Sequence, residues 1–542
     1  MGSSIIRHRM KYRVERDPLG DVRVPANAYY GAQTRRAVEN FPISGLTAPP
    51  ELVVSTVQIK KAAAEANAAL GRLPADIAAA IVRAADEILA GKWRDQFVVD
   101  VYQAGAGTSH NMNANEVLAN RAAELLGGKR GTYTRVHPND HVNMGQSTND
   151  VFPTATRLAI LAMVGPLVDA ATRLAEGLDD KSRAFADVLK TGRTHLQDAV
   201  PLTLGQEFSG YAANVGHAAG DVALASMQLL ELNLGATAVG TGLNAGDDYT
   251  ARAIANLEAY TEAPVRPAAN RFRVTQSMGD VLAFSAALRR LAVEVNKVAS
   301  DLRLLSSGPR AGIAEVRLPP VQPGSSIMPG KVNPSVPEMV NQVCFQVYGC
   351  DAAILAASDA SQLELNVMMP VIAWNAIHAT RIMTNAMRVL QARCIADLRA
   401  DEERCRELLD RSTALATALS PYIGYEATAD IAKTSIKTGR SIRDLVRERK
   451  LLPEWQLDEI LSPEAMTSPG VPGQEHDEHP TNPDARRDRA GRRTGGGRAG
   501  RATHAAVSAG GSRGARAAGS QRVAAARPDH GRTGGGRRKP RR

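Results

Sequence analysis

Apolar residues recur at alternating spacings of three and four along several long stretches of the chain. The clearest stretch, residues 281–305, keeps Phe, Leu and Val on one face of a helix of about seven turns. The same spacing recurs over residues 204–229 and 336–357, and two further long helices are predicted at 151–174 and 367–390. Many positions in these stripes are alanine, which favours close approach of neighbouring helices. The pattern predicts a central bundle of long, near-parallel and antiparallel helices.

Shorter patterns flank this bundle on both sides. Upstream, an irregular segment with room for a short hairpin precedes predicted helices at 51–70 and 74–91, and downstream three shorter helices are predicted at 401–419, 427–438 and 441–449. The fold class is therefore mostly α, with three domains and a basic C-terminal tail. The expected divisions are a flexible leader at 1–11, an N-terminal domain at 12–146, a central bundle at 147–397, a C-terminal helical domain at 398–465 and a disordered tail at 466–542.

Composition narrows the class of protein. Apolar residues make up 44% of the 542 positions and charged residues 23%, which excludes collagen-like, fully disordered and membrane-embedded chains. The longest charge-free apolar stretch, residues 365–380, has 16 residues, short of the roughly 20 that a membrane-spanning helix requires. The four cysteines form no CxxC pair, and the N-terminus lacks the order of a secretory signal. We therefore expect reduced thiols in a cytoplasmic protein with no membrane partner.

The net charge of +10 is concentrated at one end of the chain. Residues 481–542 carry 17 Lys or Arg and 3 Asp, so the body before them is mildly acidic. Gly, Ala and Arg dominate this segment, which cannot bury enough apolar surface to offset its ordering entropy. An arginine-rich arm for nucleic acid is one interpretation. An extension without function is the interpretation that we favour, so nucleic acid is not the expected partner.

Four stretches rich in Gly, Ser, Thr, Asn and His interrupt the helical pattern. They supply many hydrogen-bond donors without fixed charge. The stretches are residues 105–113, 137–140 together with 146–150, 192–198, and 324–334. The last contains a Pro-Gly break that suits a hinged lid.

Each of the first three stretches also has a purely structural interpretation. Residues 147–150 are good helix N-caps. His137 and His195 are compatible with ordinary hydrogen-bonded histidines, and Thr108 with a residue that closes a turn. The fourth stretch, residues 324–334, lies between two long helices. Turn formation or helix capping does not account for eleven consecutive residues of this composition, so we expect a functional role for it.

The fourth stretch, Gly324-Ser-Ser-Ile-Met-Pro-Gly-Lys-Val-Asn-Pro334, resembles the signature loop of the aspartase/fumarase superfamily, and the other three match in order and spacing. The resemblance covers residues 12–463. The first stretch, Gly105-Ala-Gly-Thr-Ser, is similar to the aspartate ammonia-lyase branch, as are residues 233–242 and 306–312. Ile423-Gly-Tyr425 is more similar to the fumarase branch. Class II fumarate hydratase therefore stays open as the alternative function.

The resemblance implies elimination of ammonia from L-aspartate to give fumarate, without metal or cofactor. Removal of a C3 proton beside a carboxylate creates an enediolate, which preorganised donors stabilise. The resemblance implies a catalytic set of Ser325, His195 and Lys331, a substrate-binding set of Thr108, Ser147, Thr148, Asn149, Thr194, Ser326 and Asn333, and a supporting set of Glu338, His137, Asn139 and Asp140.

By the same resemblance, Ser325 is the general base. A serine hydroxyl is protonated at neutral pH, and each unit by which its pKa falls requires about 1.4 kcal/mol of stabilisation of the alkoxide. Lys331 and backbone N–H groups of the closed loop are expected to supply it. Glu338 resembles the carboxylate that pairs with the site histidine in this family and is expected near His195 in the assembled protein, with a structural salt bridge as the alternative.

The four stretches lie at ends of long helices and cannot all meet within one bundle. The resemblance therefore implies a homotetramer whose active sites are shared between subunits, so that a monomer is inactive. Expected partners are L-aspartate, fumarate and ammonia.

Overall fold

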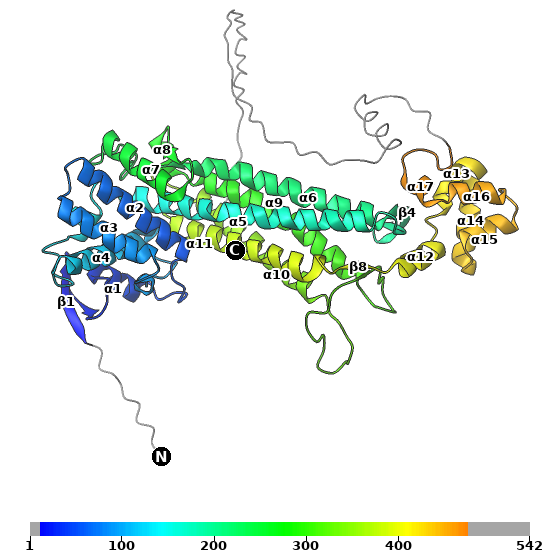
Figure 1. Ribbon diagram of the computed structural model, residues 1–542, viewed down its shortest axis with the longest axis horizontal. Helices are drawn as coiled ribbons and strands as arrows, with labels where there is room; N and C mark the ends of the chain where they lie inside the picture. The colour runs from blue at the N-terminus through cyan, green and yellow to red at the C-terminus, as the bar shows by residue number, and fades with distance from the viewer. Residues whose placement is uncertain (1–10, 475–542) are drawn as a thin grey trace, which may run out of the picture. The chain divides into compact units, whose positions relative to one another are not determined.

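Five long helices enclose the largest apolar core in residues 11–474, the part of the chain that the computed structural model describes (Figure 1). They are α5 (Thr148–Ala184), α6 (Leu204–Ser226), α9 (Gly279–Leu305), α10 (Ser335–Asp359) and α11 (Met369–Leu390). α5 packs against α6 and α11, α9 against α6 and α10, and α10 against α11. The stripe residues Phe284, Leu288 and Leu291 are at most 1% exposed. The mostly α fold class and its predicted bundle are confirmed.

α5 begins earlier and ends later than the apolar pattern predicts. Its 37 residues extend over about 55 Å. Among residues 11–474 it is also the one helix that is long and apolar enough to cross a membrane, yet 61% of that apolar window is buried within the protein. The apolar side chains of α5 therefore serve mainly as bundle core.

The N-terminal segment forms a hairpin and four helices. β1 (Tyr12–Asp17) pairs antiparallel with β2 (Gly20–Pro25), with Tyr12 opposite Pro25. The helices are α1 (Ala32–Asn40), α2 (Pro50–Ala69), α3 (Ala75–Leu89) and α4 (Thr108–Leu125). The hairpin, α2 and α3 were expected, and α2 packs against α5.

The start of α4 differs from the prediction. The sequence pattern placed residues 105–113 outside the helices, whereas the helix begins at Thr108. Asn111, Asn113 and Asn115 are buried in it although they are polar. Residues 109–120 of this helix are all buried, polar and apolar alike, so no single apolar stripe marks where the helix begins.

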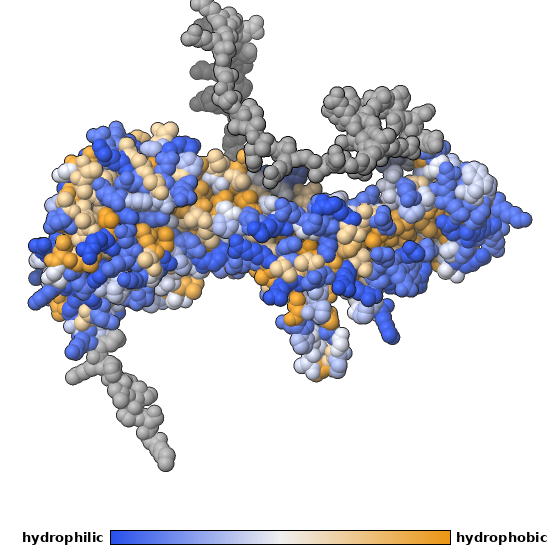
Figure 2. All heavy atoms as spheres, viewed as in Figure 1, coloured by the Kyte–Doolittle hydropathy of each residue, from blue (hydrophilic) through white to orange (hydrophobic). Residues whose placement is uncertain are grey.

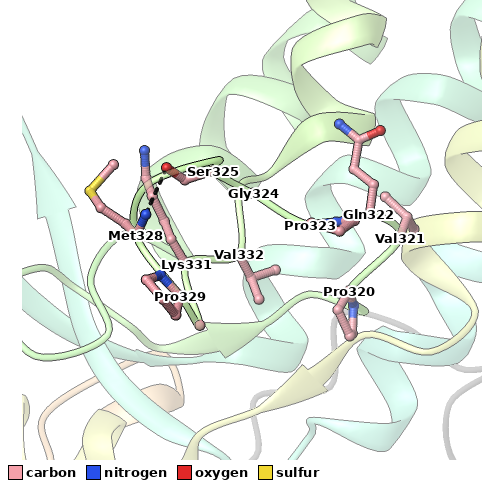
Figure 3. A pocket seen from close by; sticks show the side chains of 11 residues that line it. Pro320, Val321, Gln322, Pro323, Gly324, Ser325, Met328, Pro329, Lys331 and Val332 are labelled. Carbon is pink, nitrogen blue, oxygen red and sulfur yellow. Dashed lines mark hydrogen bonds between the residues drawn. The ribbon is translucent and has the colours of Figure 1, made fainter.

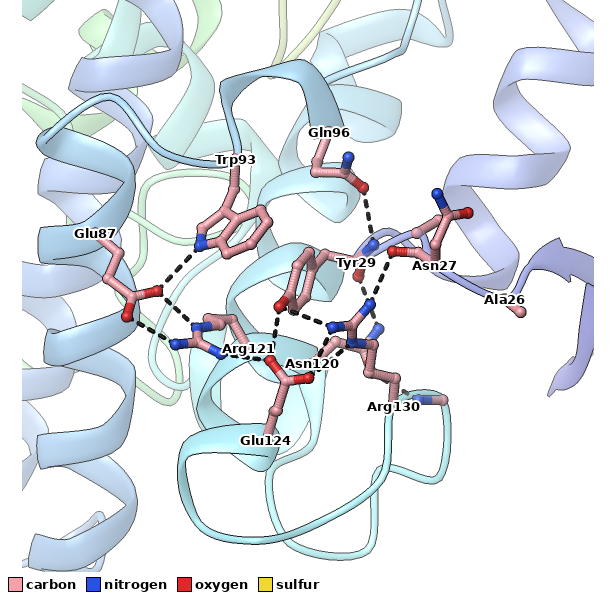
Figure 4. Close-up of polar contacts among 12 residues, drawn as sticks. Ala26, Asn27, Tyr29, Glu87, Trp93, Gln96, Asn120, Arg121, Glu124 and Arg130 are labelled. Carbon is pink, nitrogen blue, oxygen red and sulfur yellow. Dashed lines mark hydrogen bonds and ion pairs between the residues drawn. The ribbon is translucent and has the colours of Figure 1, made fainter.

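A network of charged and aromatic side chains joins α3 to α4 (Figure 4). Arg121 donates to Glu87 at 2.6 and 2.8 Å, and Trp93 Nε1 donates to the same carboxylate at 3.0 Å. The hydrogen bonds from Arg121 lower the pKa of Glu87 to about 2. Glu124 accepts from Tyr29 at 2.6 Å and from Arg130 at 2.7 Å. The network holds in place the helix that carries Thr108.

A second hairpin, absent from the prediction, follows the C-terminal end of α5. β3 (Leu189–Thr194) pairs antiparallel with β4 (Gln197–Thr203). The sequence pattern treated this segment as a loop because it is short and polar. Its two strands contact α12 (Glu402–Arg411) and α17 (Pro463–Thr467) of the C-terminal segment.

The C-terminal segment consists of short helices around a core of its own. The predicted helix at 401–419 is wrong as one element, because Ser412 is extended and its Oγ accepts from Ala414 N at 3.1 Å, which ends the first helix. The helices are α12 (Glu402–Arg411), α13 (Ala416–Ile423), α14 (Tyr425–Thr438), α15 (Ile442–Glu448), α16 (Glu454–Ile460) and α17 (Pro463–Thr467).

The predicted tail begins in residues that the structure still describes. Tyr422 OH donates to the carbonyl of Pro472, and Gln206 Nε2 to that of Thr467 at 2.9 Å. The rest of the predicted tail, from residue 475, and residues 1–10 of the predicted leader lie outside the described residues.

Small elements connect the long helices. They are α7 (Asp247–Thr261), α8 (Arg271–Gln276), a parallel pair of β5 (Glu231–Leu232) with β6 (Arg266–Pro267), and an antiparallel pair of β7 (Val316–Arg317) with β8 (Arg399–Ala400). Pro138–Val142 and Gln391–Ile395 are single π-helical turns.

Apolar side chains also remain on the outside of the bundle. Leu224 of α6 is 71% exposed, Val293 of α9 is 50%, and Phe345 and Leu355 of α10 are 57% and 52%. Figure 2 shows apolar residues interrupting the polar surface on the face in view. Exposed apolar side chains mark a surface that another protein covers where they form one contiguous patch, whereas single scattered ones are ordinary.

Candidate active site

The start of α5 presents the second polar stretch. Ser147 Oγ accepts from Asn149 N at 3.2 Å, and Asp150 accepts from Ser147 N at 2.9 Å, which completes a capping box. The structure thus confirms that residues 147–150 cap the helix. It is compatible with a binding role, because the N-terminus of a helix favours negative charge.

The first stretch lies close to this helix start. Ala106 N donates to the carbonyl of Val367 at 2.9 Å, and Thr108 Oγ1 contacts the carbonyl of Gly105 at 3.4 Å. One turn into α4, Asn111 Nδ2 donates to Thr148 Oγ1 at 3.1 Å. A side chain on Gly107 would lie 2.1 Å from the Phe152 ring of α5, so this close approach requires glycine. The structure therefore brings the stretches around Thr108 and Thr148 together.

The third stretch lies elsewhere in the chain. Thr194 and His195 are exposed at the tip of the β3–β4 hairpin, and His195 and Leu196 both have φ of 57°. Arg193 holds the hairpin through Glu315, with hydrogen bonds of 3.0 and 2.9 Å. Because this hairpin follows the far end of α5, about 55 Å of helix separates it from Ser147.

The fourth stretch forms a loop around a cavity of about 460 Å³ (Figure 3). Ser325 Oγ accepts from the backbone N–H groups of Ile327 and Met328, both at 3.2 Å. Asn333 Nδ2 closes the base of the loop by donating to the Gly324 carbonyl at 2.7 Å. Lys331 lines the cavity, and Ser326 belongs to the same loop. Both residues are exposed. Two N–H donors on one hydroxyl oxygen favour its anionic form.

The supporting residues are dispersed. Glu338 lies half-buried in the first turn of α10 and forms no ion pair within residues 11–474. His137 Nδ1 accepts from Asp140 N at 3.2 Å, and Asn139 and Asp140 are exposed. His137 and His141 are four residues apart, but no group of three His, Cys, Asp or Glu within the described residues is placed to hold a metal ion. All four cysteines are free and buried.

A buried polar layer under the start of α5 was missed from the sequence. It contains Lys60 of α2, His110 of α4 and Asp150 of α5. Burial lowers the pKa of Lys60 to about 7 and that of His110 to about 4, and it raises the pKa of Asp150 to about 7. The sequence feature that could have revealed this layer is Lys60 itself, because it lies among the buried residues of α2, between Thr56 and Asn67.

His110 gives a pH dependence of stability. Its Nε2 lies 2.9 Å from Thr56 Oγ1, and its ring packs against Phe97 and Phe152. Between pH 6.5 and about 4 the unfolded state binds one more proton than the folded state. The stability that neutral His110 provides is complete above pH 6.5, and falls by about 1.4 kcal/mol per pH unit below it.

We expect His110→Gln to lose this slope in urea unfolding between pH 7 and pH 4.5. The raised pKa of Asp150 acts in the opposite direction but is common to both proteins, so the difference between the two slopes reports His110. Equal slopes in both proteins would contradict the assignment.

Comparisons with known proteins agree with this architecture. A family model described as "Lyase" matches residues 20–349, and one described as "Fumarase C C-terminus" matches residues 415–468. An aspartate ammonia-lyase of Pseudomonas aeruginosa is 51% identical over 84% of this chain and 97% of its own, and one of Bacillus sp is 48% identical over 85% and 98%.

Two solved structures share the fold over 85% of this chain and all of theirs. One is described as fumarate lyase:delta crystallin from Brucella melitensis bound to cobalt, with 48% identity and a TM-score of 0.81. The other is a class II fumarase from Schistosoma mansoni, with 38% identity and a TM-score of 0.81. The chain therefore belongs to the lyase family that includes the aspartate ammonia-lyases and the class II fumarases.

Proposed function

We propose that the protein is an aspartate ammonia-lyase, which reversibly eliminates ammonia from L-aspartate to give fumarate. The observation that carries this proposal is the set of relatives with that activity, 48 to 51% identical along nearly their whole length. The aligned regions include the start of α5, the β3–β4 hairpin and the loop around Ser325. We propose the cytoplasm as its location.

The start of α5 is proposed to hold the carboxylate on which charge develops. Thr108, Ser147 and Thr148, with Ser326 from the loop, present hydroxyl groups to it. Asn111 donates to Thr148 Oγ1, so the Thr148 hydroxyl proton is left to point at a ligand. These donors, together with the helix N-terminus, favour the enediolate over the substrate because hydrogen bonds strengthen as charge accumulates.

Ser325 is proposed to remove the C3 proton. The N–H groups of Ile327 and Met328 already donate to its oxygen, which supports stabilisation of an alkoxide. Lys331, Asn333 and Thr194 are proposed to hold the other carboxylate. Asn149 and His195 meet the amino group, and closure of the loop excludes water.

The complete site is proposed to form only between subunits of a homotetramer. Two observations support this: about 55 Å of α5 separates Ser147 from His195 within one chain, and exposed apolar side chains lie on α6, α9 and α10. Glu338 is proposed to support His195 of another subunit, and His137, Asn139 and Asp140 to form a second anion site.

Fumarate hydratase is the second candidate, and the similarity to a class II fumarase at 38% identity favours it. Production of fumarate from L-aspartate, followed by its ultraviolet absorbance, separates the two candidates.

A further inference from the structure

Lys60 is a fully buried lysine that has no ion-pair partner among the residues that the structure describes. Its side chain projects from α2 with no exposed surface. Its Nζ donates to Asn143 Oδ1 at 2.9 Å and to Gln146 Oε1 at 2.8 Å. Among residues 11–474 no carboxylate lies within 4.0 Å of Nζ. A buried charge paired only with amides is costly to the folded protein, so its retention calls for a reason other than stability.

Both hydrogen-bond acceptors of Lys60, Asn143 and Gln146, are connected to the residues at the start of α5. Asn143 Oδ1 also accepts from Asn111 Nδ2 at 3.3 Å, and Asn111 Nδ2 donates to Thr148 Oγ1. Asn143 Nδ2 donates to the carbonyl of Gln146 at 3.2 Å, and Gln146 is followed directly by Ser147. Lys60 thus fixes the segment that sets the direction of the Ser147 and Thr148 side chains.

The charged groups around Lys60 come from each element packed against it. Asp150 of α5 is buried, and its carboxylate accepts from the N–H groups of Ser147, Gly235 and Thr237. His110 of α4 pairs with Thr56, and Tyr249 of α7 is buried near Asp150. Arg72 donates to the carbonyl of Ala245.

This environment makes the charge of Lys60 responsive to a ligand. Burial lowers the pKa of Lys60 to about 7, while the charge of Asp150 acts in the other direction. A dianion that arrives at the start of α5 favours the protonated form of Lys60.

We propose that Lys60 is a positioning residue that holds Gln146 and Asn143 under the start of α5 and, when a dicarboxylate binds there, places a positive charge behind it. This inference rests on the proposed function, which assigns a substrate carboxylate to Ser147 and Thr148. The charge acts through the amides, without contact with the substrate. Its effect increases as the carboxylate gains charge in the enediolate.

Two variants remove the net positive charge at this position in different ways. Lys60→Gln keeps a hydrogen-bond donor but is neutral. Gln146→Glu keeps the lysine and gives its ammonium a carboxylate counter-ion, at the cost of the hydrogen bonds that Gln146 Nε2 donates to the carbonyls of Val142 and Met144. The control is Lys61→Met, which alters the neighbouring lysine of α2, whose partner is Asp86 at 2.8 Å.

The measurements are the inhibition constants of succinate and of succinamate, in which one carboxylate is replaced by a neutral amide, together with kcat, KM and the melting temperature. The melting temperatures show how much stability each variant loses, and the two inhibitors are compared within each folded variant. Both charge-removing variants should bind succinate at least tenfold more weakly, lose much less affinity for succinamate, and lower kcat. Lys61→Met should match the wild type.

Equal losses for the two inhibitors, or wild-type affinity for succinate in Gln146→Glu, would overturn the proposal. A purely structural role of Lys60 predicts instead that each variant loses affinity for succinate and for succinamate to the same extent. The wild type reports separately on the proposed function: absence of fumarate from L-aspartate refutes that function, whereas the ratios of variant to wild type test Lys60.

Discussion

Replacement of Ser325 by alanine is expected to lower kcat for L-aspartate by about 10² to 10⁴, the usual contribution of a general base. The loop keeps its shape in this variant, because Asn333 still closes its base on the Gly324 carbonyl. The hydroxyl oxygen that accepts from Ile327 and Met328 is lost, and with it the only proposed acceptor of the C3 proton. Steady-state kinetics and the inhibition constant of succinate measure the two effects separately.

The neighbouring serine provides the matched control. Ser326 belongs to the same loop but is assigned to carboxylate binding, so Ser326→Ala should raise KM with a smaller loss of kcat. Succinate should bind Ser325→Ala nearly as well as the wild type. Near-normal turnover by Ser325→Ala, or an exchange of the two phenotypes, would remove Ser325 from the role of base.

Mixed tetramers are expected to recover activity that neither parent has. Asn149→Ala damages the start of α5, and His195→Ala damages the hairpin beyond its other end, about 55 Å away in the same chain. If one site takes Asn149 from one subunit and His195 from another, random one-to-one assembly leaves roughly a quarter of the sites intact. The measurement is turnover of L-aspartate by the two variants refolded together, compared with each refolded alone.

The alternative arrangement gives the opposite result. If each site formed within one chain, every site in a mixed tetramer would carry one of the two lesions and no activity would return. Folded monomers that turn over L-aspartate would contradict the shared site in the same way. Co-refolding of the His195→Ala protein with Ser325→Ala extends the test to the loop.

The sequence predicts the bundle well because its helices bury one apolar face. Phe284, Leu288 and Leu291 follow the stripe and are buried, as expected. The beginning of α4 was not predicted because residues 109–120 are buried on every side and include Asn111, Asn113 and Asn115, so no apolar stripe marks the helix. The break at Ser412 depends on a single hydroxyl that caps its own backbone.

The candidate site, too, was predicted from the sequence only in part. Its residues are identified by a resemblance of short polar stretches, and the structure shows that Thr108 and Thr148 lie at neighbouring helix starts. The network under them could not be read from the sequence, because the partners of Lys60 lie more than 80 residues away on another element. The same holds for the bonds between Arg193 and Glu315, which are 122 residues apart.

The identity of the leaving group is the central claim, and one assay tests it directly. The purified protein is incubated in parallel with L-aspartate and with L-malate, and fumarate is followed by its ultraviolet absorbance, with Ser325→Ala as the blank. The proposed function predicts fumarate from L-aspartate and none from L-malate. Fumarate from L-malate alone would contradict it and assign the protein to the fumarate hydratases.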